Sequence, residues 1–208
     1  MTDWEACYQE GNTPWDKGHP APLLDELARN RPDIFKGRVL VPGCGLGHDA
    51  RWLVEQDCEV TGLDIAPSAV ARAKEHDPSG RVRFVQGNLF DLPADLRGAF
   101  DMVWEHTCLS AMPPELRPSY AAGMVSALKP GGCIVGVFYM NPDMDPGEMG
   151  PPFGLSVDEL IAMWAAVGMV PEEHWVPNVA YEGREGRERF MILKPDPQTS
   201  QIPDQTAA

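Results

Sequence analysis

A glycine-rich segment near residue 45 constrains the fold of this 208-residue chain more than any other feature. The apolar run 39–41 leads into Gly43, Gly45 and Gly47, and a helical pattern begins at His48. Glycine at alternate positions permits a sharp turn and leaves bare main chain at a helix N-terminus, where a ligand can lie. A strand, a glycine loop and a helix in this order predict the opening unit of an α/β fold that binds a nucleotide-like cofactor.

Short β-branched runs alternate with longer segments of helical apolar spacing along most of the chain. We expect strands at residues 38–41, 59–63, 82–86, 100–105, 133–139 and 189–193. We expect helices at residues 20–30, 48–55, 67–76, 114–128 and 157–167. This alternation predicts an α/β fold in which a doubly wound, mostly parallel sheet carries helices on both faces.

Three local signals mark the ends of the expected helices. Pro67 stands at the first position of a helical pattern, where proline is favoured. Ser156 and Glu159 have the spacing of a capping box in front of an apolar pair. Residues 129–132, Lys-Pro-Gly-Gly, predict the end of a helix followed by a turn.

Composition and charge exclude several classes of function. The chain has 17 Lys and Arg against 31 Asp and Glu residues, a net charge of −14 that repels phosphate backbones and anionic lipids, so we expect no nucleic-acid or membrane partner. Apolar runs such as 133–140 are shorter than the roughly 18 residues of a membrane span, and residues 1–5 lack a basic leader, so we expect a cytoplasmic protein. Five scattered cysteines without a C-x-x-C pair predict neither disulfides nor a metal site.

The length of the chain fits one domain. We expect residues 1–194 to form it, with a distinct N-terminal segment at 1–37. Residues 195–208 are polar and proline-bearing, so we expect a disordered tail there. A monomer is the simplest expectation for the oligomeric state.

An acidic residue follows the glycine loop at a distance that suits a cofactor. Asp64 ends the second expected strand, 17 residues after Gly47, where its carboxylate can accept hydrogen bonds from both hydroxyls of a ribose. The alternative is that Asp64 caps the helix that begins near Pro67. With glycines at three alternate positions and this acid, the chain resembles the class I S-adenosylmethionine-dependent methyltransferases more than the nicotinamide dehydrogenases. The resemblance implies a seven-stranded, Rossmann-like fold, S-adenosylmethionine as cofactor and S-adenosylhomocysteine as product.

The same resemblance assigns roles to two later segments. Residues after the third strand lie beside the adenine in that family, which implies cofactor contacts for Asn88 and Leu89. The family's fourth strand ends at the methyl-transfer site, which implies a cofactor contact for Glu105. Phe90 and Trp104 belong to the same segments and have the alternative interpretation of ordinary core aromatics.

The segment before the first strand is unusually aromatic, with Trp4, Tyr8 and Trp15. Together with the glycine loop and residues 115–118 and 150–153, it makes the chain similar to the thiopurine S-methyltransferase superfamily, especially its thiol and halide methyltransferase branch. The resemblance implies that the three rings form a lid around the cofactor, whose sulfonium cation an aromatic face attracts by about 0.5 to 2 kcal/mol. The alternative is an N-terminal helix held in place by core tryptophans.

The expected acceptor site departs from that branch. The halide branch carries an acid, a tyrosine and two phenylalanines after the fourth strand, whereas this chain reads Glu-His-Thr-Cys-Leu at 105–109. His106 is therefore a candidate catalytic residue, because a histidine with a pKa of about 6.5 can transfer protons at neutral pH. Tyr139 matches an acceptor-site tyrosine of the halide branch and is the second candidate. Structural roles, for His106 as a hydrogen-bonded residue and for Tyr139 in the core or an interface, remain the alternatives.

The expected function is methyl transfer to a small soft nucleophile, a thiol or a sulfide, by in-line displacement. Such a reaction needs alignment and desolvation more than acid–base help, which explains why no catalytic dyad is evident in the sequence. The alternatives are a halide methyltransferase, an O- or N-methyltransferase of a small metabolite, a sensor that binds S-adenosylmethionine without turnover, and a nicotinamide oxidoreductase.

Two segments near the end of the chain each have two interpretations. The loop 140–154 is either a lid over the acceptor or an ordinary solvated connection. Arg184, Arg187 and Arg189 either meet an anionic acceptor or belong to a solvated hairpin.

Overall fold

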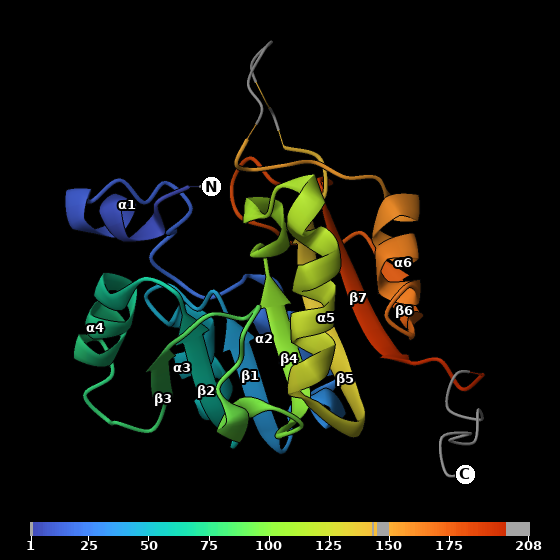
Figure 1. Ribbon diagram of the computed structural model, residues 1–208, viewed down its shortest axis with the longest axis horizontal. Coiled ribbons are helices and arrows are strands. Elements are labelled where there is room, and N and C mark those ends of the chain that lie inside the picture. The colour runs from blue at the N-terminus through green and yellow to red at the C-terminus, as the bar shows by residue number, and fades with distance from the viewer. Residues whose placement is uncertain (1, 143, 145–149, 199–208) are drawn as a thin grey trace, which may run out of the picture.

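Within residues 2–142, 144 and 150–198, which the computed structural model describes, seven strands form one sheet in the order β3-β2-β1-β4-β5-β7-β6 (Figure 1). The strands are β1 (Arg38–Pro42), β2 (Glu59–Asp64), β3 (Arg83–Gln86), β4 (Phe100–His106), β5 (Leu128–Tyr139), β6 (Met169–Trp175) and β7 (Glu188–Pro195). Strands β1 to β5 pair in parallel, and β7 is antiparallel to both β5 and β6. The expected fold class, a doubly wound and mostly parallel seven-stranded sheet, is confirmed.

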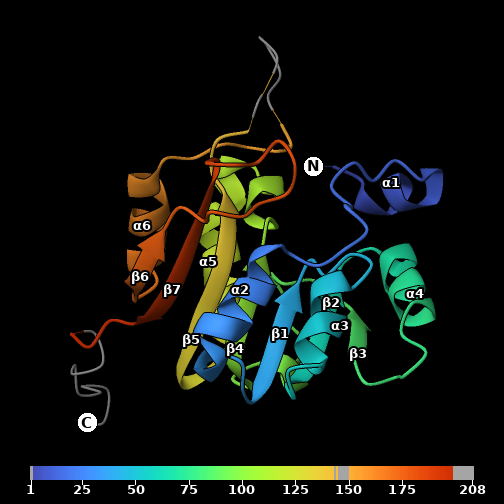
Figure 2. The same ribbon diagram turned by 180° about the vertical axis from the view of Figure 1, so that it is seen from behind.

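Helices lie on both faces of the sheet. They are α1 (Trp4–Glu10), α2 (Leu23–Asn30), α3 (His48–Val54), α4 (Pro67–Glu75), α5 (Arg117–Ala127) and α6 (Val157–Ala165), with 3₁₀ turns at Pro32–Ile34, Ala94–Leu96, Leu109–Ala111 and Pro114–Leu116. Helices α5 and α6 cover one face (Figure 1), and α2 and α3 cover the other (Figure 2). No helix among the described residues is both long and apolar enough to cross a bilayer.

The central strands supply both cores, because successive side chains of a strand point to opposite faces of the sheet. In β1, Val39 and Val41 pack in the core that includes the apolar side chains of α2 and α3. Leu40, between them, packs in the core that includes Met124 of α5 and Trp164 of α6. Both cores contain fully buried side chains, and such close packing makes the sheet a firm support for the loops at its carboxyl edge.

Two of the three helix-end signals are confirmed, and the third is partly wrong. Pro67 is the first residue of α4, and Ser156 and Glu159 form a complete capping box at α6. Helix α5 ends before residues 129–132 as expected, but these residues lie within β5 instead of forming a turn outside the sheet. The pairing of β4 with β5 shifts register there, so the glycines are accommodated as an irregularity in the strand.

Other expected boundaries differ in detail. Strand β6 was not expected from the sequence, and the helix expected at 20–30 begins at Leu23. The helix expected at 114–128 is a 3₁₀ turn followed by α5. Residues 143 and 145–149 of the loop 140–154, and residues 199–208 of the expected tail, lie outside the described residues.

The N-terminal segment begins with α1, which lies beside α4 near the carboxyl edge of the sheet (Figures 1 and 2). The carboxylate of Glu5 accepts hydrogen bonds from the amide and the hydroxyl of Ser68, at 2.9 and 2.6 Å. Arg72 donates to the carbonyl of Tyr8 at 2.7 Å. These contacts place the rings of the N-terminal segment over the glycine loop.

Candidate active site

A cavity of about 450 Å³ lies at the carboxyl ends of the parallel strands, where the segments after β1, β2, β3 and β4 converge. It adjoins the β1–β4 pair, where the strand order changes direction, and ligands of open α/β sheets bind at such a point. Most site residues expected from the sequence line this cavity: Trp4, Tyr8, Trp15, Gly43, Asp64, Asn88, Leu89, His106 and Tyr139. Gly45, Gly47 and Glu105 do not line it.

The three glycines of the loop have positive φ angles, of 58°, 52° and 75° at Gly43, Gly45 and Gly47, which L side chains rarely adopt. A Cβ atom on Gly43 would lie 2.5 Å from the sulfur of Cys108. A Cβ atom on Gly45 would lie 2.9 Å from the hydroxyl of Tyr8. The loop therefore needs glycine both for its backbone and for the close approach of other side chains.

Asp64 lies at the tip of β2, and backbone amides hold both of its carboxylate oxygens. Gly45 donates to Oδ2 at 2.8 Å and Ala66 donates to Oδ1 at 2.9 Å. Ala66 is the N-cap of α4, and its side chain makes no hydrogen bond to the first turn. The Ser68 amide of that turn donates to Glu5, so Asp64 does not cap the helix. The side chain also lines the cavity, and each oxygen keeps a further lone pair for a ligand hydroxyl. Burial raises the pKa of Asp64, and the amide hydrogen bonds partly offset this increase.

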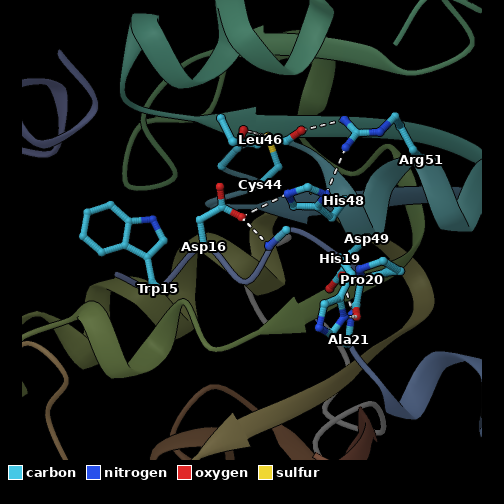
Figure 3. Close-up of polar contacts among 12 residues, drawn as sticks. Trp15, Asp16, His19, Pro20, Ala21, Cys44, Leu46, His48, Asp49 and Arg51 are labelled. Carbon is cyan, nitrogen blue, oxygen red and sulfur yellow. Dashed lines mark hydrogen bonds and ion pairs between the residues drawn. The ribbon is translucent and has the colours of Figure 1, made fainter. Parts of the chain in front are cut away.

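The N-terminal rings form one cluster at the cavity. Trp4 and Trp15 make an edge-to-face contact with ring centroids 5.2 Å apart, and Tyr8 lies 5.8 Å from Trp15. The indole nitrogen of Trp15 donates to the Tyr8 hydroxyl at 3.2 Å. The residue after Trp15 anchors the segment to the protein, because the carboxylate of Asp16 contacts His48 at 3.0 Å (Figure 3).

His106, the last residue of β4, lines the cavity with a ring that is held on two sides. Its Nδ1 lies 2.8 Å from Oδ2 of Asp49 in α3. Tyr181 stacks on the ring with centroids 5.4 Å apart and an interplanar angle of 25°. Burial lowers the pKa of His106, but the carboxylates of Asp49 and Glu188 raise it by more than burial lowers it. The net pKa lies above the ordinary value of histidine.

Tyr139, the last residue of β5, lines the cavity together with Arg184. The Arg184 guanidinium lies over the Tyr139 ring at 4.5 Å and over the Tyr181 ring at 5.4 Å. It also forms an ion pair of 3.6 Å with Glu188, and its side chain is only 12% exposed. A solvated hairpin therefore does not describe Arg184, whereas Arg187 and Arg189 lie away from this cavity.

Glu105 occupies the core beneath the cavity. Its Oε1 accepts hydrogen bonds from the Leu109 amide at 2.8 Å and the Tyr120 hydroxyl at 3.1 Å. The residue is fully buried, and burial raises the pKa of its carboxyl to about 7 although these two donors lower it. Its contacts shape the turn after β4, which carries Cys108 into the cavity wall.

Two segments singled out by the family resemblance, 115–118 and 150–153, meet beside the cavity. Arg117 donates to the carbonyl of Gly154 at 2.9 Å, and Phe153 donates through its amide to the carbonyl of Ser110 at 2.6 Å. Pro151 and Pro152 line the cavity. This end of the loop 140–154 is therefore part of the cavity wall.

Several lining or supporting residues were missed by the sequence analysis. Asp49 follows the glycine loop by two positions, but a charge in the first turn of a helix is ordinary and gave no sign of burial. Tyr181 lies in a polar segment without periodicity. Ile65, a large apolar residue that is 46% exposed, lines the cavity and was also missed. Phe90, for which a core position was the alternative, is 37% exposed and lines the cavity, so it is not a core aromatic.

Comparison with known proteins identifies the family. Residues 1–176 match the family model described as thiopurine S-methyltransferase. Thiocyanate methyltransferase 1 of Arabidopsis thaliana is 34% identical over 197 residues, which cover 90% of this chain and 82% of that protein. Probable thiol methyltransferase 2 of the same species is 35% identical over 161 residues, which cover 75% of this chain and 68% of that protein.

A solved structure supports the fold independently. The crystal structure of Burkholderia thailandensis 1,6-didemethyltoxoflavin-N1-methyltransferase, with bound 1,6-didemethyltoxoflavin and S-adenosylhomocysteine, matches with a TM-score of 0.67 over 92% of this chain and 84% of that chain. At 22% identity this likeness shows the fold alone. The family match and the two relatives confirm the resemblance drawn from the sequence: the chain belongs to the thiopurine S-methyltransferase family.

Proposed function

We propose that this chain transfers a methyl group from S-adenosylmethionine to the sulfur of a small thiol. The observation that carries the proposal is one cavity that Asp64 and the N-terminal rings share with His106 and Tyr139, so that cofactor and acceptor groups border the same space. Membership of a methyltransferase family and similarity to a probable thiol methyltransferase support the choice of reaction and acceptor.

The cavity residues fit the polar parts of S-adenosylmethionine. Asp64 offers lone pairs for ribose hydroxyls at the tip of β2. Gly43 leaves the backbone bare at the cavity wall, so a ligand can approach the main chain. Asn88 follows β3 and offers an amide side chain at the same wall.

The remaining walls fit its apolar and cationic parts. The exposed apolar surfaces of Ile65 and Phe90 suit the faces of a purine ring. The rings of Trp4, Tyr8 and Trp15 suit a sulfonium cation, which aromatic faces attract by about 0.5 to 2 kcal/mol. We assign cofactor binding to these two groups of residues.

When bound, S-adenosylmethionine supplies an electrophilic methyl group. The protein has to align the acceptor sulfur and exclude water, since a soft nucleophile reacts faster when it is desolvated. Apolar side chains from the two 3₁₀ turns after β4 and the link between them, including Met112 and Leu116, wall the cavity on that side. We assign the acceptor end to His106 and Tyr139, with His106 placed to hold or receive the acceptor's proton.

Isothermal titration of the purified protein with S-adenosylmethionine and with NADH tests the cofactor. We expect heat with the sulfonium compound and none with NADH. A folded protein that shows no heat with S-adenosylmethionine would contradict the proposal. Release of S-adenosylhomocysteine in the presence of alkyl and aryl thiols then tests turnover, and binding without turnover of any acceptor would indicate a sensor.

A second candidate is methyl transfer to thiocyanate or a halide. The similarity to thiocyanate methyltransferase 1 favours it, as does the Arg184 guanidinium at the cavity wall, whose side chain is 12% exposed and which suits an anion. The same assay with thiocyanate, iodide and thiols as competing acceptors separates the two candidates by their relative kcat/KM.

A further inference from the structure

The carboxylate of Asp49 determines which nitrogen of His106 carries a hydrogen. Asp49 accepts from the amide of Ala21 at 2.8 Å and from the indole of Trp104 at 2.8 Å, and its Oδ2 also lies 2.8 Å from Nδ1 of His106. Burial raises the pKa of Asp49, but His106, Trp104 and Ala21 together bring it below the ordinary value. An ionised carboxylate only accepts hydrogen bonds, so Nδ1 of His106 must donate.

In the neutral ring, which is the form above the raised pKa of His106, the other ring nitrogen is therefore an acceptor. A neutral imidazole with its hydrogen on Nδ1 has a lone pair on Nε2. Nε2 is buried and has no hydrogen-bond partner among residues 2–142, 144 and 150–198. Because the ring lines the cavity, Nε2 is the ring nitrogen left for a ligand that brings a hydrogen-bond donor.

The orientation of the ring is fixed from both sides. The bond to Asp49 comes from α3, and the stacked ring of Tyr181 comes from the segment between β6 and β7. Tyr181 is itself held, because its hydroxyl donates to the carbonyl of His19 at 2.7 Å. The stack holds the plane of the imidazole, and a flip within that plane would break its hydrogen bond to Asp49.

Charged groups from α3, β4, β7 and the segment between β6 and β7 set the protonation equilibrium of His106. Asp49 on α3 and Glu188 on β7 favour the protonated ring, while Arg184 opposes it. Glu105, the preceding residue on β4, is a buried carboxyl that also interacts with the ring. The excess of carboxylates stabilises an imidazolium once a proton arrives at Nε2.

We propose that Asp49 and His106 form a proton-accepting dyad, and that the methyl acceptor is a thiol that enters the cavity protonated and not a preformed anion such as thiocyanate or a halide. This inference rests on the proposed methyl transfer to sulfur and assigns the substrate class. His106 is the catalytic residue, and Asp49 is a positioning residue that acts through it.

The proposed step is a single proton transfer. The S–H bond of the acceptor breaks, its electron pair stays on sulfur, and the proton moves to Nε2 of His106. The resulting imidazolium lies between the carboxylate of Asp49 and the new thiolate, so both of its N–H groups have anionic partners. The proton passes to water when the product leaves, which restores the neutral ring.

Nitrogen-15 NMR of the histidine rings in the cofactor-free protein tests the dyad without turnover. At a pH above the His106 pKa, we expect the Nδ1–H tautomer for His106 in the wild type, and we expect a lower His106 pKa in Asp49→Asn because the nearest carboxylate loses its charge. A wild-type ring with the hydrogen on Nε2 would overturn the inference, as would an unchanged pKa in a folded Asp49→Asn protein. If Asp49→Asn does not fold, the wild-type tautomer alone decides.

Kinetics of His106→Gln tests the substrate class. Glutamine can still donate to Asp49 but cannot take up the proton, so we expect kcat/KM for alkyl thiols at neutral pH to fall by about 100-fold. Turnover of thiophenols acidic enough to be ionised at that pH should fall much less. His76→Gln, a change at an exposed histidine outside the cavity, is the matched control.

The outcomes separate this inference from the proposed function. An equal loss for alkyl thiols and ionised thiophenols in folded His106→Gln would overturn the dyad and leave thiol methylation intact. Wild-type protein that prefers thiocyanate or iodide to every thiol would overturn the substrate class. Failure of the wild type to bind S-adenosylmethionine would overturn the proposed function itself.

Discussion

Nε2 of His48, the first residue of α3, lies 3.0 Å from the carboxylate of Asp16 in the N-terminal segment (Figure 3). On the other side of the ring, Nδ1 lies 3.1 Å from the guanidinium of Arg51, which also donates to the carbonyl of Leu46 at 2.6 Å. A guanidinium only donates, so Nδ1 accepts and Nε2 donates to Asp16. Burial lowers the pKa of His48, Asp16 raises it and Arg51 lowers it, with a net decrease that agrees with a neutral ring.

This contact predicts that Asp16 supports cofactor binding from outside the cavity. Asp16→Ala removes the bond to His48 and a bond from the Gly18 amide, each worth about 0.5 to 1.5 kcal/mol. The neighbouring Trp15, which lines the cavity, loses this anchor. We expect the affinity for S-adenosylmethionine to fall by about tenfold, measured by isothermal titration.

An exposed carboxylate far from the cavity provides the control for this variant. Asp158→Ala in the first turn of α6 changes the charge by the same amount, and we expect it to bind S-adenosylmethionine as the wild type does. Unchanged affinity in a folded Asp16→Ala protein would show that the aromatic cluster holds Trp15 without this anchor.

Gly43→Ala should destabilise the protein through two separate effects. Its φ of 58° strains any side chain, and the new Cβ would lie 2.5 Å from the Cys108 sulfur. We expect a loss of about 1 to 3 kcal/mol in the free energy of unfolding, measured with urea on the cofactor-free protein.

Backbone strain and the contact with Cys108 can be separated with a second glycine that has a positive φ but no neighbour. Gly80 has a φ of 63° with no atom within 4 Å of an added Cβ, so Gly80→Ala measures backbone strain alone. We expect Cys108→Ala to recover part of the loss in Gly43→Ala. An equal loss in Gly43→Ala and Gly80→Ala would show that the Cys108 contact costs nothing.

The parallel part of the sheet was predictable because its strands are buried on both faces and read as apolar runs between turn signals. Strand β6 was not predictable from the sequence, because Pro171 and the charges at Glu172 and Glu173 are untypical of a strand. It is tolerated because β6 is the last strand of the sheet, and its pairing shifts register between Pro171 and Glu173.

Most site residues predicted from the sequence line the cavity, His106 and Tyr139 included, whereas the residues that hold His106 in place were not predicted. Gly43 and Asp64 each lie at the end of a predicted strand, and their spacing is typical of residues that meet at the same edge of a parallel sheet. The pair of Asp49 and His106 joins residues 57 positions apart, from α3 and β4, and no local pattern records it. Glu105 was expected at the cofactor, but the alternation of β4 turns it into the core beside Tyr120.

Asp64→Asn tests the proposed ribose contact. The amide oxygen can still accept one backbone hydrogen bond, but the charge and one acceptor are lost. We expect a 10- to 100-fold loss of affinity for S-adenosylmethionine, about 1.4 to 3 kcal/mol. Asp77→Asn is a matched control, because Asp77 is equally buried and accepts from the Val82 amide but lies outside the cavity. Equal affinities of the Asp64 and Asp77 variants would contradict the assignment.

Glu105→Gln should change how stability depends on pH. Burial raises the pKa of Glu105 from 4.5 to about 7, so the folded protein binds this proton more tightly than the unfolded chain does. The free energy of unfolding contributed by this group therefore falls as pH rises from about 4.5 to about 7, and stays low above that range. The buried Oε2, which has no partner among the described residues, is the oxygen expected to carry the proton.

Glutamine mimics the protonated carboxyl at every pH, since its oxygen can accept from the Leu109 amide and the Tyr120 hydroxyl. Urea unfolding across this pH range should show the stability of Glu105→Gln rising relative to the wild type by roughly 3 kcal/mol at most. Glu59→Gln, at a carboxylate that is 74% exposed, should run parallel to the wild type. Parallel curves for Glu105→Gln would mean that the Glu105 carboxylate is ionised in the folded protein, held by donors stronger than the two hydrogen bonds described.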